Sequence, residues 1–93
     1  MKAVYKLNVD FGRMGDVSGV FVAEKEQVDK LLKIKPQVYF GEILGKHSEI
    51  VLTLTKKDLK FVTDDEEFIK LFQKHKLENG YDPFDYLDEN WDK

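Results

Sequence analysis

The chain has 93 residues, of which 42% are hydrophobic, and a formal net charge of −3. Seven Phe and four Tyr argue against a disordered chain, and the length allows only one modest core, so we predict a single domain over residues 1–93. The absence of cysteine excludes disulfides and thiolate zinc sites, and the lack of any signal-peptide-like or membrane-spanning apolar run predicts a cytoplasmic protein without membrane contact.

Two strands and a glycine-rich loop are predicted at the start of the chain. Apolar and polar residues alternate from Ala3 to Phe11, which is typical of a strand with one buried face. Residues 12–19, GRMGDVSG, interrupt this pattern with three glycines, and residues 20–23 resume an apolar run. The two runs therefore predict a β-hairpin with a long loop.

An amphipathic helix follows, from Glu24 to about Ile34. Its apolar residues Val28, Leu31 and Leu32 recur at helical spacing, with charged residues between them. Pro36 ends the helix, because the residue before a proline is disfavoured in the helical region.

Residues 37–55 predict a central β-hairpin with alternating faces on both strands. A two-residue turn would pair Tyr39 with Leu52, whereas a four-residue loop would pair Tyr39 with Leu54. The tight turn also sets two glutamates opposite each other, and like charges across a ladder are unfavourable. We therefore favour the longer loop.

Both registers predict the same buried face for this hairpin, because a shift of two residues preserves the side-chain phase. We expect Leu52 to be nearly inaccessible. The predicted core face consists of Tyr39, Ile43, Ile50, Leu52 and Leu54. The other face carries Val38, Phe40 and Val51, and an exposed edge here would allow pairing with a second copy, so a homodimer through a sheet edge is left open.

A last strand is predicted at residues 59–62, followed by a capped helix. Thr63 and Glu66 have the spacing of a capping box, and Asn79-Gly80 is a typical left-handed helix stop. The predicted buried stripe is Phe68, Leu71 and Phe72, with Ile69 and His75 on its flanks.

Asp82-Pro83 is typical of the start of a further short helix, with the aspartate as N-cap. The element order is then ββαβββα plus a short C-terminal helix. This order predicts an α+β fold, with a mainly antiparallel sheet and helices packed on one face.

The C-terminal segment, residues 80–93, is both acidic and aromatic. Residues 78–93 hold six acids and one base, a balance of −5, whereas the remaining 77 residues balance to +2. This segment could dock on the domain, leaving its acids in solvent, or expose aromatic anchors to a partner. We predict a partner-binding surface made of Tyr81, Asp85, Tyr86, Asp88, Glu89, Trp91 and Asp92.

Two other places in the chain are candidate sites. Arg13, the only arginine, and Gly15 lie in the glycine-rich loop, where backbone N–H groups and a guanidinium could bind an anion. The loop matches no phosphate-binding spacing, so a simple hairpin loop is the competing interpretation. His47 at the central hairpin tip and His75 lack an accompanying carboxylate set, so no metal site is predicted.

No nucleophile–base pair or cofactor fingerprint is present, so we predict that the chain is not an enzyme and needs no cofactor. The preferred hypothesis is a small binding protein acting through protein–protein contact, such as a phage-type or regulatory inhibitor that covers a basic site on its partner. Direct nucleic-acid binding is not expected, because phosphates would be repelled by the acidic segment. The alternative is a small-ligand or anion-binding domain around Arg13.

Overall fold

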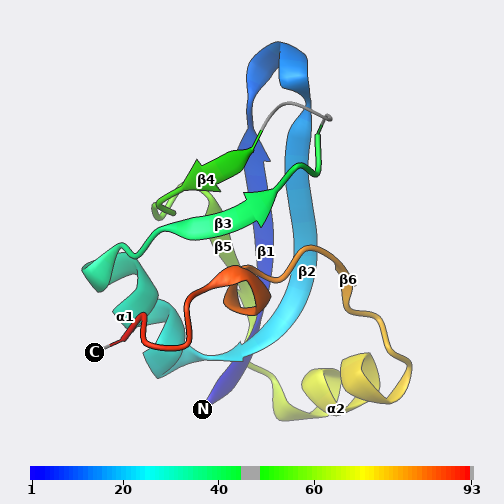
Figure 1. Cartoon of the computed structure of the whole chain (residues 1–93). Helices are drawn as coiled ribbons and strands as arrows, with labels where there is room; N and C mark the ends of the chain where they lie inside the picture. Colours follow the sequence, from blue (N-terminus) through cyan, green and yellow to red (C-terminus); the bar gives the residue numbers. More distant parts are fainter. Residues whose placement is uncertain (45–48, 93) are drawn as a thin grey trace.

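The centre of the fold is a long antiparallel hairpin. Figure 1 shows the computed structural model, which describes residues 1–44 and 49–92. Strand β1 (Lys2–Asp10) pairs along its whole length with β2 (Asp16–Glu24), and a short 3-10 helix, η1 (Gly12–Met14), closes the turn. The predicted hairpin is confirmed, but its second strand begins at Asp16, because residues that were expected in the loop continue the ladder.

Two further strands extend this hairpin into a four-stranded antiparallel sheet of order β5-β1-β2-β6. Strand β5 (Leu59–Thr63), which the sequence predicted at residues 59–62, pairs with β1, but it is not the last strand of the chain. Strand β6 (Asn79–Gly80) pairs with β2. The expectation that Asn79-Gly80 stops a helix is therefore wrong, because these residues lie in the sheet and the preceding helix ends earlier.

A second, two-stranded sheet crosses one face of the first (Figure 1). It consists of β3 (Val38–Gly41) and β4 (Ile50–Leu52), which confirms the central hairpin but not its register. Gly41 pairs with Ile50, and after an irregularity between Tyr39 and Gly41, Tyr39 pairs with Val51. The bulge coincides with a φ of 75° at Gly41, which glycine adopts at little cost.

This register reverses the predicted faces of β3. Tyr39 is 50% exposed, whereas Val38 and Phe40 are buried, because a shift by an odd number of residues exchanges the two sides of a strand. The predictions for Ile50 and Leu54 hold, since both are buried. Leu52 was expected to be nearly inaccessible and is only partly buried.

The helices complete the predicted α+β fold, but the prediction that they pack on one face of the sheet is wrong, because the two α-helices cover opposite faces. Helix α1 (Lys25–Ile34) and the 3-10 helix η2 (Pro83–Tyr86) lie on the same side of the large sheet as β3 and β4. Helix α2 (Glu66–Lys74) lies against the opposite side, where Ile69 and Phe72 pack on Val4. The large sheet therefore has one face beneath the layer of β3, β4, α1 and η2, and a second face against which α2 packs.

The N-terminus and the buried face of helix α2 both differ from the prediction. Its N-cap is Asp65, whose side chain accepts from the Phe68 N–H at 3.3 Å, while the Thr63 hydroxyl accepts from the Asp65 N–H. Phe68 and Leu71 are 42% and 53% exposed. The predicted stripe is thus wrong at these two positions, because α2 rests on the sheet through the flank that carries Ile69.

The main core lies between the large sheet and the layer of β3, β4, α1 and η2. Phe21, Leu7, Leu31 and Leu54 are among its largest fully buried side chains. No helix among the described residues is long and apolar enough to span a membrane.

Candidate functional site

The acidic aromatic segment docks on the core through two sets of aromatic contacts. Phe84 packs edge-on against Phe21, with ring centroids 6.3 Å apart, and against Trp91 at 6.0 Å. Tyr86 packs against Phe40 of β3 at 4.8 Å. The segment is therefore part of the fold, which is the first of the two alternatives that the sequence left open, and is not a free tail.

Three backbone features hold this segment in place. Asp82 caps η2 by accepting from the Phe84 N–H at 3.0 Å, as predicted. The Tyr81 N–H donates to the Ser18 carbonyl at 3.0 Å, which continues the contact between β6 and β2. Further along, the Asn90 N–H donates to the Asp88 carboxylate, and the Trp91 N–H donates to the Asp88 carbonyl.

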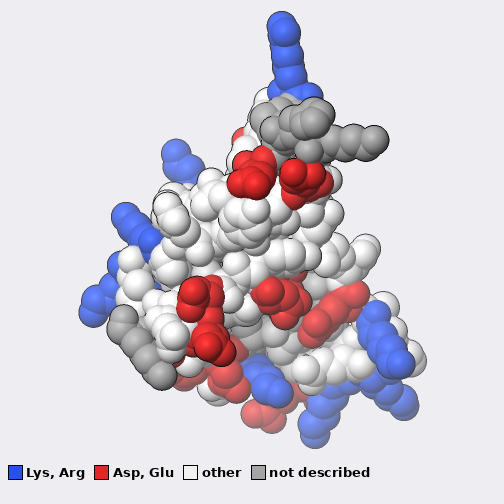
Figure 2. Space-filling view, viewed as in Figure 1, with Lys and Arg blue, Asp and Glu red and all other residues white. Residues whose placement is uncertain are grey.

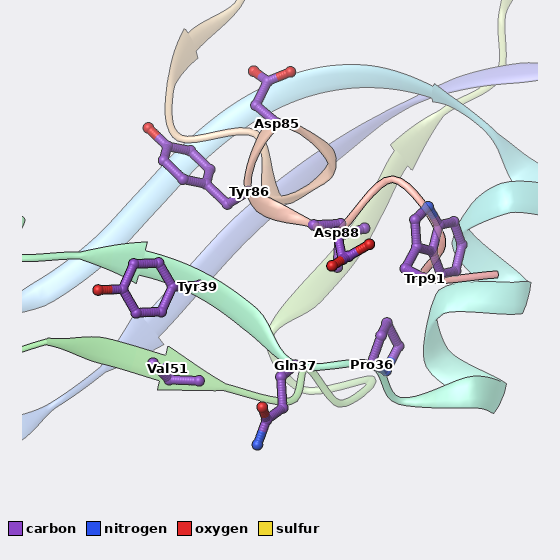
Figure 3. A pocket seen from close by; sticks show the side chains of 9 residues that line it. Pro36, Gln37, Tyr39, Val51, Asp85, Tyr86, Asp88 and Trp91 are labelled. Atoms are coloured by element: carbon purple, nitrogen blue, oxygen red, sulfur yellow. The ribbon is translucent and has the colours of Figure 1, made fainter. Parts of the chain in front are cut away.

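An open groove of about 630 Å³ runs between this docked segment and the outer face of the β3–β4 sheet. Figure 3 shows its two walls, with Tyr39 and Val51 on the strands and Tyr86 and Trp91 on the C-terminal segment. The remaining lining residues are Pro36, Gln37, Asp85, Leu87 and Asp88. We call this feature the acidic groove.

The acidic groove carries negative charge without a lining cation. Asp85 and Asp88 line it and are exposed, and no Lys or Arg is among its lining residues in the described chain. At the other end, hydrogen bonding with Glu49, together with the charges of Glu49 and Glu42, raises the pKa of the Tyr39 hydroxyl. Figure 2 shows this face of the molecule, where acidic groups lie among uncharged surface and most Lys and Arg groups lie at the outline.

The structure brings together only some of the predicted partner-binding residues. Asp85, Tyr86, Asp88 and Trp91 line the acidic groove. The other three lie elsewhere, with Glu89 exposed but outside the lining. Tyr81 is partly buried against Phe40 and Tyr86, and Asp92 forms a salt bridge with Lys30 of α1 at 3.5 Å.

The second wall of the groove was missed from the sequence. The sequence predicts Tyr39 in the core and Val51 on the opposite face of the hairpin, because the predicted register is wrong by an odd number of residues. Their pairing directly across the ladder was the missing signal, since opposite residues share a face. A correct register alone would have placed an exposed tyrosine beside an exposed valine.

The loop around Arg13 is built from contacts that leave little for an anion. The Gly12 N–H donates to the Asp10 carboxylate at 2.7 Å, and the Gly15 N–H donates to the Gly12 carbonyl at 3.1 Å. Arg13 is exposed, and Asp10 pairs across the hairpin with Asp16, so two acidic residues stand at the base of the loop that carries Arg13. Anion binding here stays a prediction that these contacts do not favour.

Only one of the two histidines, His75, lies in the part of the chain that the structure describes. His75 is the exposed C-cap residue of α2, and His47 lies outside the described residues. Within residues 1–44 and 49–92, no three metal-ligating side chains come together.

Asp82 has an unusual ionisation for a residue that caps a helix. Burial raises its pKa to about 6, and the charges of Asp85 and Glu78 add to this, while the hydrogen bond from the Phe84 N–H opposes it. In the unfolded chain an aspartate titrates near 3.9. Between about pH 4 and pH 6 the folded state therefore holds a proton that the unfolded state has released, so the free energy of unfolding falls as the pH rises.

We predict that Asp82→Asn stabilises the protein at pH 7, because asparagine keeps the cap and removes the buried charge. A shift of two pKa units corresponds to about 3 kcal/mol, but Asp82 is only partly buried, so solvent screening reduces the expected gain to about 1 kcal/mol. Urea unfolding at pH 7 and pH 4 measures it, and the gain should vanish at pH 4. A loss of stability at pH 7, or an equal gain at both pH values, would contradict the assignment.

Comparisons with known proteins identify no relative of this chain. No protein-family model matches the chain. Searches of curated proteins and of solved structures likewise found no match. What the acidic groove does must therefore be argued from its own residues.

Proposed function

We propose that the chain is a small, non-enzymatic binding protein whose acidic groove receives a basic segment of a protein partner. The observation that carries this proposal is the composition of the groove. Three aromatic side chains from two different parts of the chain face it, and both of its charged lining residues are acids.

The two kinds of side chain have different roles in this proposal. Asp85 and Asp88 attract a cationic partner over the Debye length and so act mainly on the rate of association. Tyr39, Tyr86 and Trp91 offer large, rigid surfaces on which lysine or arginine can pack its methylenes and place its charge over a ring. These contacts act mainly on dissociation, as aromatic anchors do at other interfaces.

The proposal requires neither a cofactor nor catalysis. No histidine, serine, cysteine or lysine is among the groove residues that the structure describes, so the commonest nucleophiles and bases are missing beside its carboxylates. A protein that covers a basic surface on its partner keeps phosphates or acidic segments from that surface. The proposed role is therefore regulatory or inhibitory. The complex with the partner does not require a second copy of this chain.

A homodimer through a sheet edge stays a separate prediction. The hairpin face on which it was based is unavailable, because Val38 and Phe40 are buried. The edge strand β5 still carries Phe61 and Val62, which are 52% and 49% exposed. Pairing at β5 would leave the acidic groove open, so the two proposals do not compete.

We predict that Asp85→Asn/Asp88→Asn slows association with a basic peptide and weakens its salt dependence. The probe is a synthetic peptide that alternates arginine with glycine, measured by surface plasmon resonance on the full chain at two salt concentrations. Two exposed carboxylates contribute about 0.2–1 kcal/mol each, so we expect affinity to fall roughly twofold to thirtyfold. Tyr39→Ala, at an exposed position, should instead speed dissociation.

The matched control is Asp16→Asn/Glu67→Gln, which removes the same charge from exposed positions outside the groove. If this control weakens binding as much as the groove variant, the peptide senses only net charge and the proposal fails. Deleting residues 80–93 is not a suitable test, because it would remove β6 and the Phe84 contact with Phe21.

A further inference from the structure

The side of the large sheet that faces α2 is covered only at one end. Successive side chains alternate along β1, so Val4, Lys6 and Asn8 share the face opposite the main core. Val4 is buried beneath α2, with Ile69 and Phe72 against it. Lys6 and Asn8 are exposed. Helix α2 therefore covers this face of the sheet only as far as about Lys6, and the face is exposed from Lys6 to Asn8.

Two lysines stand directly opposite each other on this open surface. Lys6 of β1 pairs with Lys60 of β5, and directly opposite residues point to the same face. Both are exposed, and like charges at this spacing destabilise a ladder. The lysine salt bridges found between described residues involve Lys25 and Lys30 instead. Among residues 1–44 and 49–92, folding thus leaves a positive pair without a salt bridge.

An apolar wall stands beside this pair. Helix α2 rests on the sheet through Ile69 and Phe72, and the flank with Glu66 and Gln73 lies beside Met1 and Lys2, at the end of β1. With 100° between successive residues, Phe68 lies on the opposite flank, on the side of the helix away from Met1 and Lys2, and Leu71 lies between that flank and the outer side of the helix. They are 42% and 53% exposed.

The sheet surface next to this apolar wall is also partly apolar. Val20 pairs with Lys6 from the β2 side and packs partly against the α2 cluster. A shallow hollow beside it is lined by Lys6, Ser18, Gly19, Val20, Asn79 and Gly80. We call the corner formed by Lys6, Lys60, Val20, Phe68 and Leu71 the basic ledge.

We propose that the basic ledge binds an acidic, amphipathic segment of a second protein. Carboxylates on such a segment would neutralise the Lys6–Lys60 pair, while its apolar side would cover Phe68 and Leu71. This surface lies across the sheet from the acidic groove, so the inference goes beyond the proposed function and does not depend on it. One molecule could then bridge a basic partner and an acidic one.

The chemistry of the ledge favours a protein segment over nucleic acid or a lipid surface. Binding to a phosphate backbone draws on many lysines and arginines, whereas the ledge offers two lysines beside an apolar wall. An amphipathic helix with acidic residues matches both parts, because its apolar side chains recur on one face.

The test uses two synthetic peptides of equal composition and charge, both built from glutamate, leucine and alanine. One places its leucines on one helical face, and the other is scrambled so that no such face forms. Fluorescence anisotropy with the full chain should show binding of the amphipathic peptide and at least tenfold weaker binding of the scrambled one. Lys6→Gln/Lys60→Gln and Phe68→Ser/Leu71→Ser should each weaken the amphipathic peptide about tenfold, which corresponds to ~1.4 kcal/mol.

Matched controls separate the ledge from general surface effects. Lys33→Gln/Lys56→Gln removes the same charge elsewhere, and Ile34→Ser removes another exposed apolar side chain. Both should bind the amphipathic peptide as the parent does, and so should the groove variant Asp85→Asn/Asp88→Asn. Thermal unfolding of Lys6→Gln/Lys60→Gln should occur at the same or a higher temperature, because a repulsion is removed.

Three results would overturn the inference. These are no binding of the amphipathic peptide, equal binding of the scrambled peptide, and equal losses in the control variants. Binding of a DNA duplex or of vesicles with anionic lipid that depends on the lysines, but not on Phe68 and Leu71, would assign the surface to a different class of ligand and also reject the proposal.

Discussion

Replacing Phe21 by alanine should lower the free energy of unfolding by about 3–5 kcal/mol. Phe21 is 1% exposed and is among the largest fully buried side chains. Its ring stacks on Tyr5 with centroids 6.1 Å apart and meets Phe84 edge-on. Truncation would remove these contacts and leave a cavity between the large sheet and the C-terminal segment. For a domain of this size, such a loss is a large part of the total stability.

Urea unfolding measures this loss, and Phe61→Ala is the matched control. Phe61 also contacts the Tyr5 ring, at 5.9 Å, but is 52% exposed, so its truncation should cost about 1 kcal/mol or less. Trp91, the only tryptophan, packs on Phe84, so its fluorescence should also change in Phe21→Ala under native conditions. Equal losses in the two variants would mean that the core is not centred on Phe21.

Gly19→Ala should have the second large effect, and it should damage the acidic groove as well as the fold. A Cβ at Gly19 would overlap the backbone of Tyr81, including its carbonyl oxygen and nitrogen. Backbone atoms cannot turn aside as a side-chain end can, so β6 and the segment after it must move away from β2. We expect a loss of about 1–3 kcal/mol or more, as for other overpacked sites.

Gly12→Ala separates this steric effect from the conformational cost of losing a glycine. Gly12 has a φ of 67°, and no heavy atom lies within 4 Å of the position that a Cβ would take there. Its replacement therefore costs only the left-handed backbone, about 1–2 kcal/mol. Binding of the basic peptide distinguishes the two variants. Gly19→Ala should weaken it because Tyr86 and Asp88 shift, whereas Gly12→Ala should bind as the parent does. Unchanged binding in Gly19→Ala would show that the groove does not depend on the β2–β6 contact.

Local patterns in the sequence determined the elements of this fold. The alternation from Ala3 to Phe11 defined β1, and the change to helical spacing after Glu24 defined α1, because each period reports which side of one segment is buried. Asp82 was identified as an N-cap from its position before a proline. All of these features depend on residues that are neighbours in the chain.

Only the tertiary structure decided which faces these elements turn outward. The bulge before Gly41 exchanged the sides of β3, and the seating of α2 on Val4 left Phe68 and Leu71 exposed. The local sequence encodes neither result. An apolar stripe that is wider than the surface it packs against can be buried along either of its two sides. The acidic groove depends on the same long-range step. Tyr39 and Trp91 are far apart in the chain, and they share a site because β6 and η2 bring the C-terminal segment alongside β3.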